Sequence, residues 1–200
     1  MAPDPHPVPR PADDARQHKL LDAALTVFLR YGFRKTSMDE VARAAQVSRQ
    51  GLYLHFATKE ELFRATVQHT LDGSLEAATA ALGDASLRLE ARLVRAFDET
   101  TGRYVGMVGA GASDLAEAGG DILPLVEQFE GQFVEAVAKA LRASGLMAGY
   151  KASGLTARQL AETLQATARG LKHGCPSRDV FVERMTVAVR AVCVPLGETS

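Results

Sequence analysis

The stretch from Thr36 to Glu61 constrains the fold of this chain more than any other part of the sequence. It reads TSMDEVARAAQVSRQGLYLHFATKEE. Two short amphipathic segments flank a tight turn, and a third helical segment begins at the end of the stretch. This order predicts two short helices and the start of a third, which is the arrangement of a helix-turn-helix DNA-binding unit.

The first helix of this unit has a recognisable start. Ser37 is followed three residues later by Glu40, the spacing of a capping box. The apolar residues that follow recur at the spacing of one helix face; they are Met38, Val41, Ala42 and Ala45. If Gln46 at the end of this helix adopts the left-handed conformation that helix ends favour, it bears a cost of about 1 kcal/mol that Gly would avoid.

The second helix is predicted to follow Ser48, a candidate N-cap, over residues 49–56, with Val47 as a buried anchor in the turn. Leu52 and Phe56 lie four apart and are expected to point inward. The exposed first turn then carries Arg49, Gln50 and Gly51. In a major groove, Arg can bond a guanine, Gln can bond an adenine, and Gly allows close approach. These three residues are therefore our predicted base-reading residues.

The third helix opens with a second box, Thr58 to Glu61, and Lys59 lies in its first turn. A lysine beside free amide groups at a helix start suits a backbone phosphate of DNA.

The whole run TSMDEVARAAQVSRQGLYLHFATKEELF resembles the signature of the TetR family of transcriptional regulators, above all V-S-x-x-x-L-Y-x-H-F-x-[ST]-K-E-x-L-F. The resemblance covers about residues 15–65, and the family commonly has Gly where this chain has Gln46. It implies a DNA-binding homodimer, most often a repressor, that a small-molecule effector releases from its operator. In this interpretation the phosphate-contacting residues are Thr36, Ser37, Ser48, Tyr53, His55 and Lys59.

Composition agrees with a local attraction to phosphate. Residues 15–60 hold eight Lys or Arg and four Asp or Glu, a net charge of +4, whereas the rest of the chain carries −5. The two cysteines, Cys175 and Cys193, accompany no secretory segment and no apolar run long enough to span a bilayer. We therefore expect a cytoplasmic protein with reduced thiols.

We predict an all-α chain in three parts: a disordered tail over 1–14, a DNA-binding domain over 15–62, and a helical ligand-binding and dimerisation domain over 63–200. Arg10 in the proline-rich tail could reach a minor groove, but an inert tail is the favoured interpretation. A helix over 15–31, stopped by Gly32, completes the three-helix domain. Further helices are expected at about 58–82, 86–108, 113–118, 122–144, 156–173 and 177–194.

The last two helices carry two apolar stripes. Either the stripes pack on each other inside one protomer, or they form a dimer interface, as the resemblance implies. Dimerisation would place two reading helices about 34 Å apart and require a pseudo-palindromic site. The predicted interface residues are Leu160, Leu164, Ala168, Leu171, Phe181, Met185, Ala188 and Val192.

The middle of the chain offers a candidate effector pocket, although an ordinary core explains each of its residues as well. Its apolar residues at helical spacing are Phe97, Tyr104, Met107, Phe129 and Phe133, with Arg103 and Gln128 as polar contacts. The glycine-rich segment 102–120 could act as a hinge.

Signals for catalysis are weak. The glycines of GMVGAG have the wrong order and context for a dinucleotide loop, and His173 and Cys175 form an isolated H-x-C. We predict no enzymatic activity, no cofactor and no metal site. The alternative hypothesis is a helical small-molecule carrier or enzyme that keeps the three-helix unit only as structure.

Overall fold

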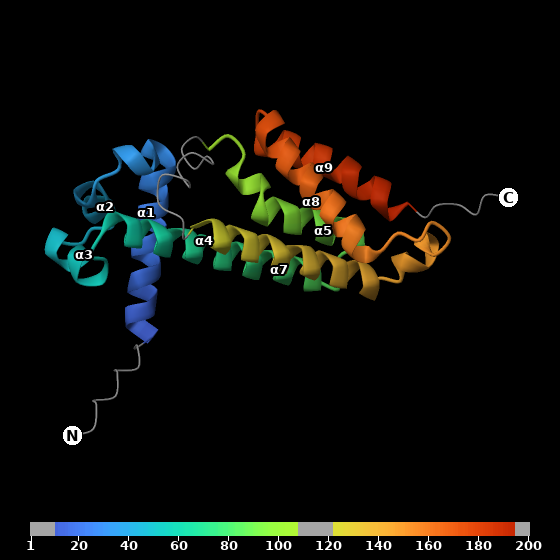
Figure 1. Ribbon diagram of the computed structural model, residues 1–200, viewed down its shortest axis with the longest axis horizontal. Coiled ribbons are helices and arrows are strands. Elements are labelled where there is room, and N and C mark those ends of the chain that lie inside the picture. The colour runs from blue at the N-terminus through green and yellow to red at the C-terminus, as the bar shows by residue number, and fades with distance from the viewer. Residues whose placement is uncertain (1–10, 108–121, 195–200) are drawn as a thin grey trace, which may run out of the picture. The chain divides into compact units, whose positions relative to one another are not determined.

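The computed structural model of the chain describes residues 11–107 and 122–194, and every regular element within these ranges is a helix (Figure 1). This confirms the predicted all-α class. The described residues divide into two compact units, residues 11–70 with 122 and residues 71–107 with 123–194. The boundary falls after Thr70, inside a long helix, whereas the sequence prediction separated the domains at residue 62.

The first unit contains α1 (Pro11–Lys35), α2 (Met38–Ala44), α3 (Arg49–His55) and the first part of α4 (Lys59–Gly83). Gly32 interrupts α1 with φ 77° and ψ 164°, which confirms the predicted stop. The helix already begins at Pro11, so residues 11–14 are helical rather than disordered. Proline suits a first helical position because its missing N–H has no partner there. The rest of the predicted tail, with Arg10, lies outside the described residues.

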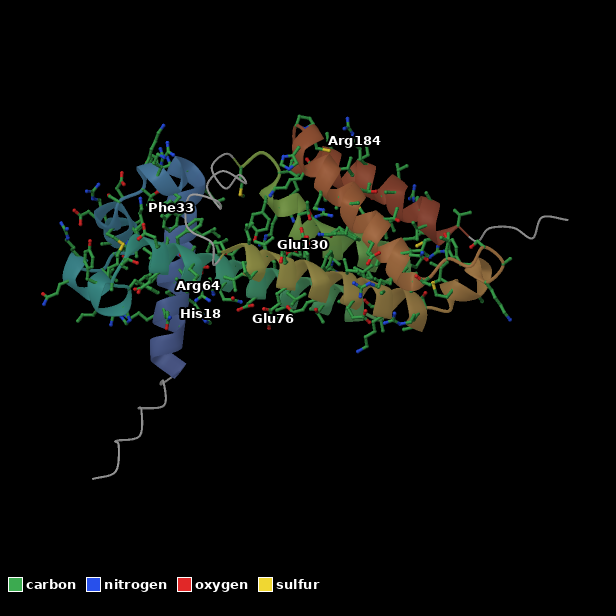
Figure 2. All side chains as sticks on the ribbon, viewed as in Figure 1. His18, Phe33, Arg64, Glu76, Glu130 and Arg184 are labelled. Carbon is green, nitrogen blue, oxygen red and sulfur yellow. The ribbon has the colours of Figure 1, made fainter. Side chains whose placement is uncertain are left out.

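Aromatic side chains form the centre of the first unit. The rings of Phe28 and Phe33, both on α1, lie 4.8 and 5.1 Å from the ring of Phe63 on α4. Figure 2 labels Phe33 among the side chains of this unit. Val41 of α2 and Leu52 of α3 are fully buried. One core therefore joins all four helices, and the two short ones depend on it because seven-residue helices are not stable alone.

Gln46 is left-handed, with φ 57°, which meets the condition for the steric cost that Gly would avoid. It is the one non-glycine residue among those described with a positive φ. The turn that it makes lets the amide of Val47 donate to the carbonyl of Ala42 at 3.0 Å, which closes the end of α2.

The second unit contains the rest of α4 together with α5 (Leu89–Thr100), η1 (Gly102–Tyr104), α7 (Ile122–Ala143), η2 (Leu146–Tyr150), α8 (Ala157–Gly174) and α9 (Arg178–Cys193). Helices α5 and α8 both pack on α9. Phe97, Phe133 and Phe181 are fully buried in one continuous core. The last three predicted helices are confirmed, and Thr156 and Ser177 cap α8 and α9.

The predicted helix over 86–108 is confirmed only over Leu89–Thr100, because α5 ends there and the chain turns through η1. Gly102 explains this change. A β-carbon at Gly102 would lie 2.8 Å from Cδ1 of Phe181 and also too close to the Asp98 carboxylate. The chain thus approaches α9 at a point where no side chain fits. The predicted helix over 113–118 and most of the predicted hinge lie outside the described residues.

Replacing Gln46 with Gly should raise the free energy of unfolding by up to about 1 kcal/mol, because Gly adopts a positive φ without steric cost. Urea unfolding measures the difference. Ala45→Gly is the matched control, since Ala45 has φ −79° and should lose roughly 0.5–1 kcal/mol on the same change. Equal destabilisation by both variants would contradict the explanation.

Gly102→Ala should lower the free energy of unfolding by about 1–3 kcal/mol through overpacking against Phe181. Gly131→Ala is the matched control, because Gly131 lies inside α7 with nothing within 4 Å of its added β-carbon. This control should gain about 0.5–1 kcal/mol from helix propensity. Thermal unfolding of both variants tests the opposite signs.

Candidate nucleic-acid interface

The start of α2 is fixed by the capping box that the sequence predicts. The amide of Glu40 donates to the Ser37 hydroxyl at 3.3 Å, and the Ser37 amide donates to the Glu40 carboxylate at 2.8 Å. The Ser37 hydroxyl also donates to the Glu40 carboxylate at 2.8 Å, and the two bonds that this carboxylate accepts, the one from the Ser37 amide foremost, hold the pKa of Glu40 below its usual value. Helix α2 is thus set at a defined point beside α3.

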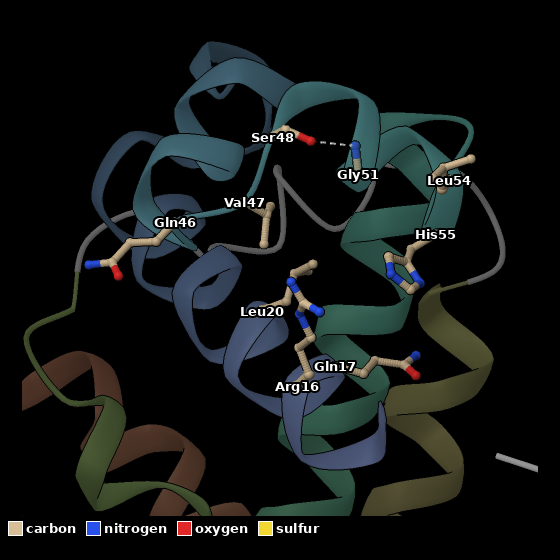
Figure 3. A pocket seen from close by; sticks show the side chains of 9 residues that line it. All are labelled: Arg16, Gln17, Leu20, Gln46, Val47, Ser48, Gly51, Leu54 and His55. Atoms are coloured by element: carbon tan, nitrogen blue, oxygen red, sulfur yellow. Dashed lines mark hydrogen bonds between the residues drawn. The ribbon is translucent and has the colours of Figure 1, made fainter. Parts of the chain in front are cut away.

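Helix α3 is fixed by one cap and one buried side. The amide of Gly51 donates to the Ser48 hydroxyl at 2.9 Å (Figure 3), and Leu52 is fully buried. A β-carbon on Gly51 would lie 3.0 Å from that hydroxyl oxygen, so the small residue leaves room for the cap. The cap and the burial of Leu52 and Phe56 are confirmed, whereas Val47 is only half-buried.

The opposite side of α3 faces solvent. Its exposed residues are Arg49, Gln50, Tyr53, Leu54 and His55. The structure thus places the predicted base-reading residues Arg49 and Gln50 together on the first turn, with Gly51 half-buried beside them.

Arg49 is held by two neighbours. Its guanidinium lies 3.1 Å from the Asp39 carboxylate of α2 and 5.6 Å from the centre of the Tyr53 ring. Its side chain remains 66% exposed. An exposed ion pair of this kind is worth about 0–1 kcal/mol, so a planar bidentate acceptor can displace the carboxylate.

The predicted phosphate-contacting residues divide into two groups. Ser37, Ser48, Tyr53 and His55 are exposed. The other two are engaged inside the domain, at the end of α1. Thr36 is 3% exposed and its hydroxyl donates to the carbonyl of Gly32 at 2.8 Å.

Lys59 is the second engaged residue. Its ammonium group donates to the carbonyl of Phe33 at 2.9 Å and lies 4.4 Å from the centre of that residue's ring. A positive charge is stabilised there by the free carbonyl groups of a helix end. Lys59 therefore ties the start of α4 to the end of α1.

A cleft of about 400 Å³ opens between α1 and α3 (Figure 3). Arg16 and Gln17 line it from α1, while Ser48, Gly51, Leu54 and His55 line it from α3 and its cap. Arg16 and His55 bring a cation and a titratable ring to the cleft. Sequence analysis missed Arg16, Gln17 and Leu54. The signal for Arg16 was its place four residues before the buried Leu20, which puts it at the exposed end of the same helix face.

The effector pocket stays a prediction, and its residues have different kinds of neighbours among the described residues. Phe97 and Phe129 both pack on Phe133, with ring centres 5.1 and 6.3 Å apart, as part of the core. Of the polar candidates, Arg103 pairs with Glu99 at 3.1 Å, and Gln128 is exposed. The Tyr104 hydroxyl bonds the Ser74 hydroxyl at 2.9 Å, and Met107 is 51% exposed.

The stripes assigned to a dimer interface lie in the core of the protomer itself, as the alternative interpretation stated. Leu160, Leu164, Ala168, Phe181 and Met185 are all buried there. Leu171, Ala188 and Val192 are half-buried against the same core. An amphipathic stripe specifies that a face is buried, and here α8 and α9 bury their stripes within one chain.

Among the described residues no group of His, Cys, Asp or Glu is arranged to hold a metal ion. His173 and Cys175 accordingly have no further ligands there. Burial raises the pKa of the Cys193 thiol to about 11, so this thiol stays protonated at neutral pH. No helix in the described ranges has the length and apolar character needed to cross a bilayer.

Comparison with known proteins gives a consistent result for the first unit. The family model for bacterial regulatory proteins of the tetR family matches residues 20–66. An uncharacterised HTH-type transcriptional regulator, YfiR of Bacillus subtilis, is 45% identical over 62 residues. That match spans 31% of this chain and 30% of YfiR, so the chain matches less than a third of the length of this relative.

Solved structures extend the similarity of fold to nearly the whole chain. The reduced form of Escherichia coli NemR is 16% identical with a TM-score of 0.71, over 92% of this chain and 99% of NemR. The regulator FadR of Bacillus subtilis, solved with stearoyl-CoA, is 14% identical with a TM-score of 0.62, over 90% of this chain and 99% of FadR. At these identities the comparison establishes a shared helical fold.

Lys59→Ala should lower the free energy of unfolding by about 1–2 kcal/mol, because the carbonyls at the end of α1 lose a charged donor. Lys35→Ala is the matched control, since Lys35 is an exposed lysine at the end of the same helix. Chemical unfolding of both variants measures the effect. Equal stability of the two would show that the Lys59 bonds contribute nothing to the fold.

Proposed function

We propose that the chain is a helix-turn-helix transcriptional regulator of the TetR family, whose model matches residues 20–66, and that it forms a homodimer that binds a pseudo-palindromic DNA operator and is released from it by a small-molecule effector. The observation that carries this proposal is the exposed side of α3. Arg49 and Gln50 project there from a helix whose opposite side is anchored by Leu52.

Base reading falls to Arg49 and Gln50 in this proposal. Arg49 leaves Asp39 and bonds a guanine through two donors, and Gln50 bonds an adenine. Gly51 keeps the cap of α3 intact and lets its backbone approach the groove. All three lie in the first helical turn, which is the part of a recognition helix that meets base edges.

Phosphate contacts come from both sides of the reading helix. Ser37, Ser48, Tyr53 and His55 are exposed for this role, and Arg16 adds a cation from α1 across the cleft. Thr36 and Lys59 contribute indirectly. Their bonds to the carbonyls of Gly32 and Phe33 fix the points at which α2 and α4 start, beside the end of α1.

Dimerisation in this proposal uses the outer faces of α8 and α9, since their apolar stripes are buried in the protomer. Thr163, Ala166 and Gly170 of α8 are exposed and small. Val187 of α9 is 65% exposed, and Ala191 follows it one turn later. Small side chains let helices approach closely, and an exposed valine gains from burial by a second copy.

The effector is proposed to bind in the second unit, where the chain shares its fold with FadR, a regulator solved with stearoyl-CoA. Repression follows if the effector and the operator favour different separations of the two reading helices. The coupling must then be reciprocal, because an effector that weakens DNA binding is itself bound less tightly in the presence of DNA.

The test is fluorescence anisotropy of the full chain with labelled duplexes tiled across the DNA that flanks its coding region, at two salt concentrations. The proposal expects one tile to bind about a thousandfold more tightly than random DNA, with affinity falling as salt rises. Equal weak binding to every tile and to a library of random duplexes would contradict it and favour the helical carrier.

Arg49→Ala should cost about 1–3 kcal/mol of binding free energy on the selected duplex and relax the preference for one base pair. Asp39→Ala is the paired variant: it removes the competitor of Arg49 without removing the donor, so sequence preference should persist. Lys59→Ala should weaken binding to all sequences alike. Equal losses on specific and random DNA for Arg49→Ala would contradict its assigned role.

Val187→Glu should convert the dimer to a monomer, because two carboxylates would meet near the symmetry axis, and should weaken operator binding through loss of the second half-site. Light scattering after size-exclusion chromatography measures the mass. Ala80→Glu is the control, an exposed alanine of α4 given the same charge. A dimer that survives Val187→Glu would place the interface elsewhere.

A further inference from the structure

Leu54 is the most exposed large apolar side chain in the described part of the chain, at 80%. It belongs to α3, a helix whose other leucine, Leu52, is fully buried. Figure 3 shows Leu54 on the outer side of the helix, at the edge of the cleft. Single exposed leucines are common on protein surfaces, so the exposure of Leu54 matters here only because of where the residue lies on α3.

The position of Leu54 around the helix identifies the surface that it shares. Successive residues of an α-helix are rotated by about 100°, so Leu54 lies almost opposite Leu52. Gln50 lies four residues earlier and therefore on the same outer line. Gln50 and Leu54 together form the outermost ridge of α3, with Arg49 and Tyr53 on one side and Gly51 and His55 on the other.

The charge around this ridge indicates the kind of partner. Arg49 flanks it on α3, and Arg16 lies across the cleft on α1. A lone apolar side chain between cations suits a polyanion with a small apolar group at its centre better than an apolar protein surface. In the major groove, thymine offers such a group in its 5-methyl.

We propose that Leu54 contacts the 5-methyl group of a thymine in each half-site, while Gln50 bonds an adenine in the same or the adjoining base pair. The ridge of α3 thereby reads A·T pairs, and Leu54 is a specificity-determining residue. This inference rests on the proposed function, because it requires α3 to enter the major groove of an operator.

The experiment replaces one thymine at a time by uracil, which lacks only the 5-methyl group. The probe is the duplex that the wild-type chain selects from a library of random 30-base-pair duplexes. For the wild type, uracil at one thymine of a half-site should lower affinity about fourfold, the effect of one buried methyl group. For Leu54→Ala, the same replacement should have no effect, while replacements elsewhere act as they do on the wild type.

Two further variants separate this contact from general loss of the apolar surface. Leu54→Met keeps an apolar side chain that reaches the same point and should retain the dependence on the methyl group. Leu155→Ala removes another exposed leucine, far along the chain, and should leave the whole uracil profile unchanged. Thermal unfolding of Leu54→Ala should match the wild type, because the side chain is 80% exposed.

The outcomes distinguish the two levels of the argument. If the wild-type chain selects a specific duplex but no uracil replacement depends on residue 54, the contact with thymine is excluded while the proposed function stands. If the wild-type chain selects no sequence from the library, the proposed function and this inference both fail.

Discussion

The free carbonyl groups at the end of α1 are the point on which the first unit depends. A helix end leaves carbonyls without partners, and in this chain two side chains from later segments supply donors. Thr36 bonds Gly32 just before α2 begins, and Lys59 bonds Phe33 where α4 begins. The break at Gly32 exposes these carbonyls to both donors. These two bonds at the end of α1 thus fix where α2 starts and where α4 begins beside α1.

The bonds of Thr36 and Lys59 and the burial of Leu52 hold one side of α3 against the domain and leave its other side exposed. A seven-residue helix cannot hold its own shape, so its inner side and its cap at Ser48 are committed to the fold. The exposed outer side contributes little to the stability of the fold. Substitutions at the exposed residues Gln50 and Leu54 should therefore cost little stability. Under the proposed function, they would change the DNA sequence that is bound while the helices that support α3 stay the same.

Local features were predictable from the sequence. The capping box at Ser37 and the left-handed Gln46 each depend on bonds within a few residues, so spacing was sufficient to find them. Features that depend on distant residues were not. The carbonyls that hold Lys59 come from 25 and 26 residues earlier, and Gly102 ends α5 because Phe181 packs against it. The stripe of Leu160 was read as an interface because periodicity shows burial without showing the partner.

The ion pair between Asp39 and Arg49 would affect which DNA sites the chain binds under the proposed function. Under the proposed function, Arg49 would leave this exposed ion pair, worth about 0–1 kcal/mol, to bond DNA, so a single phosphate oxygen would offer it little more than the carboxylate does. Once Arg49 has left, the Asp39 carboxylate would also be repelled by the negatively charged DNA backbone. Under the proposed function, Asp39 therefore competes with DNA for Arg49. This competition lowers the affinity for every DNA site at which Arg49 finds no bidentate acceptor.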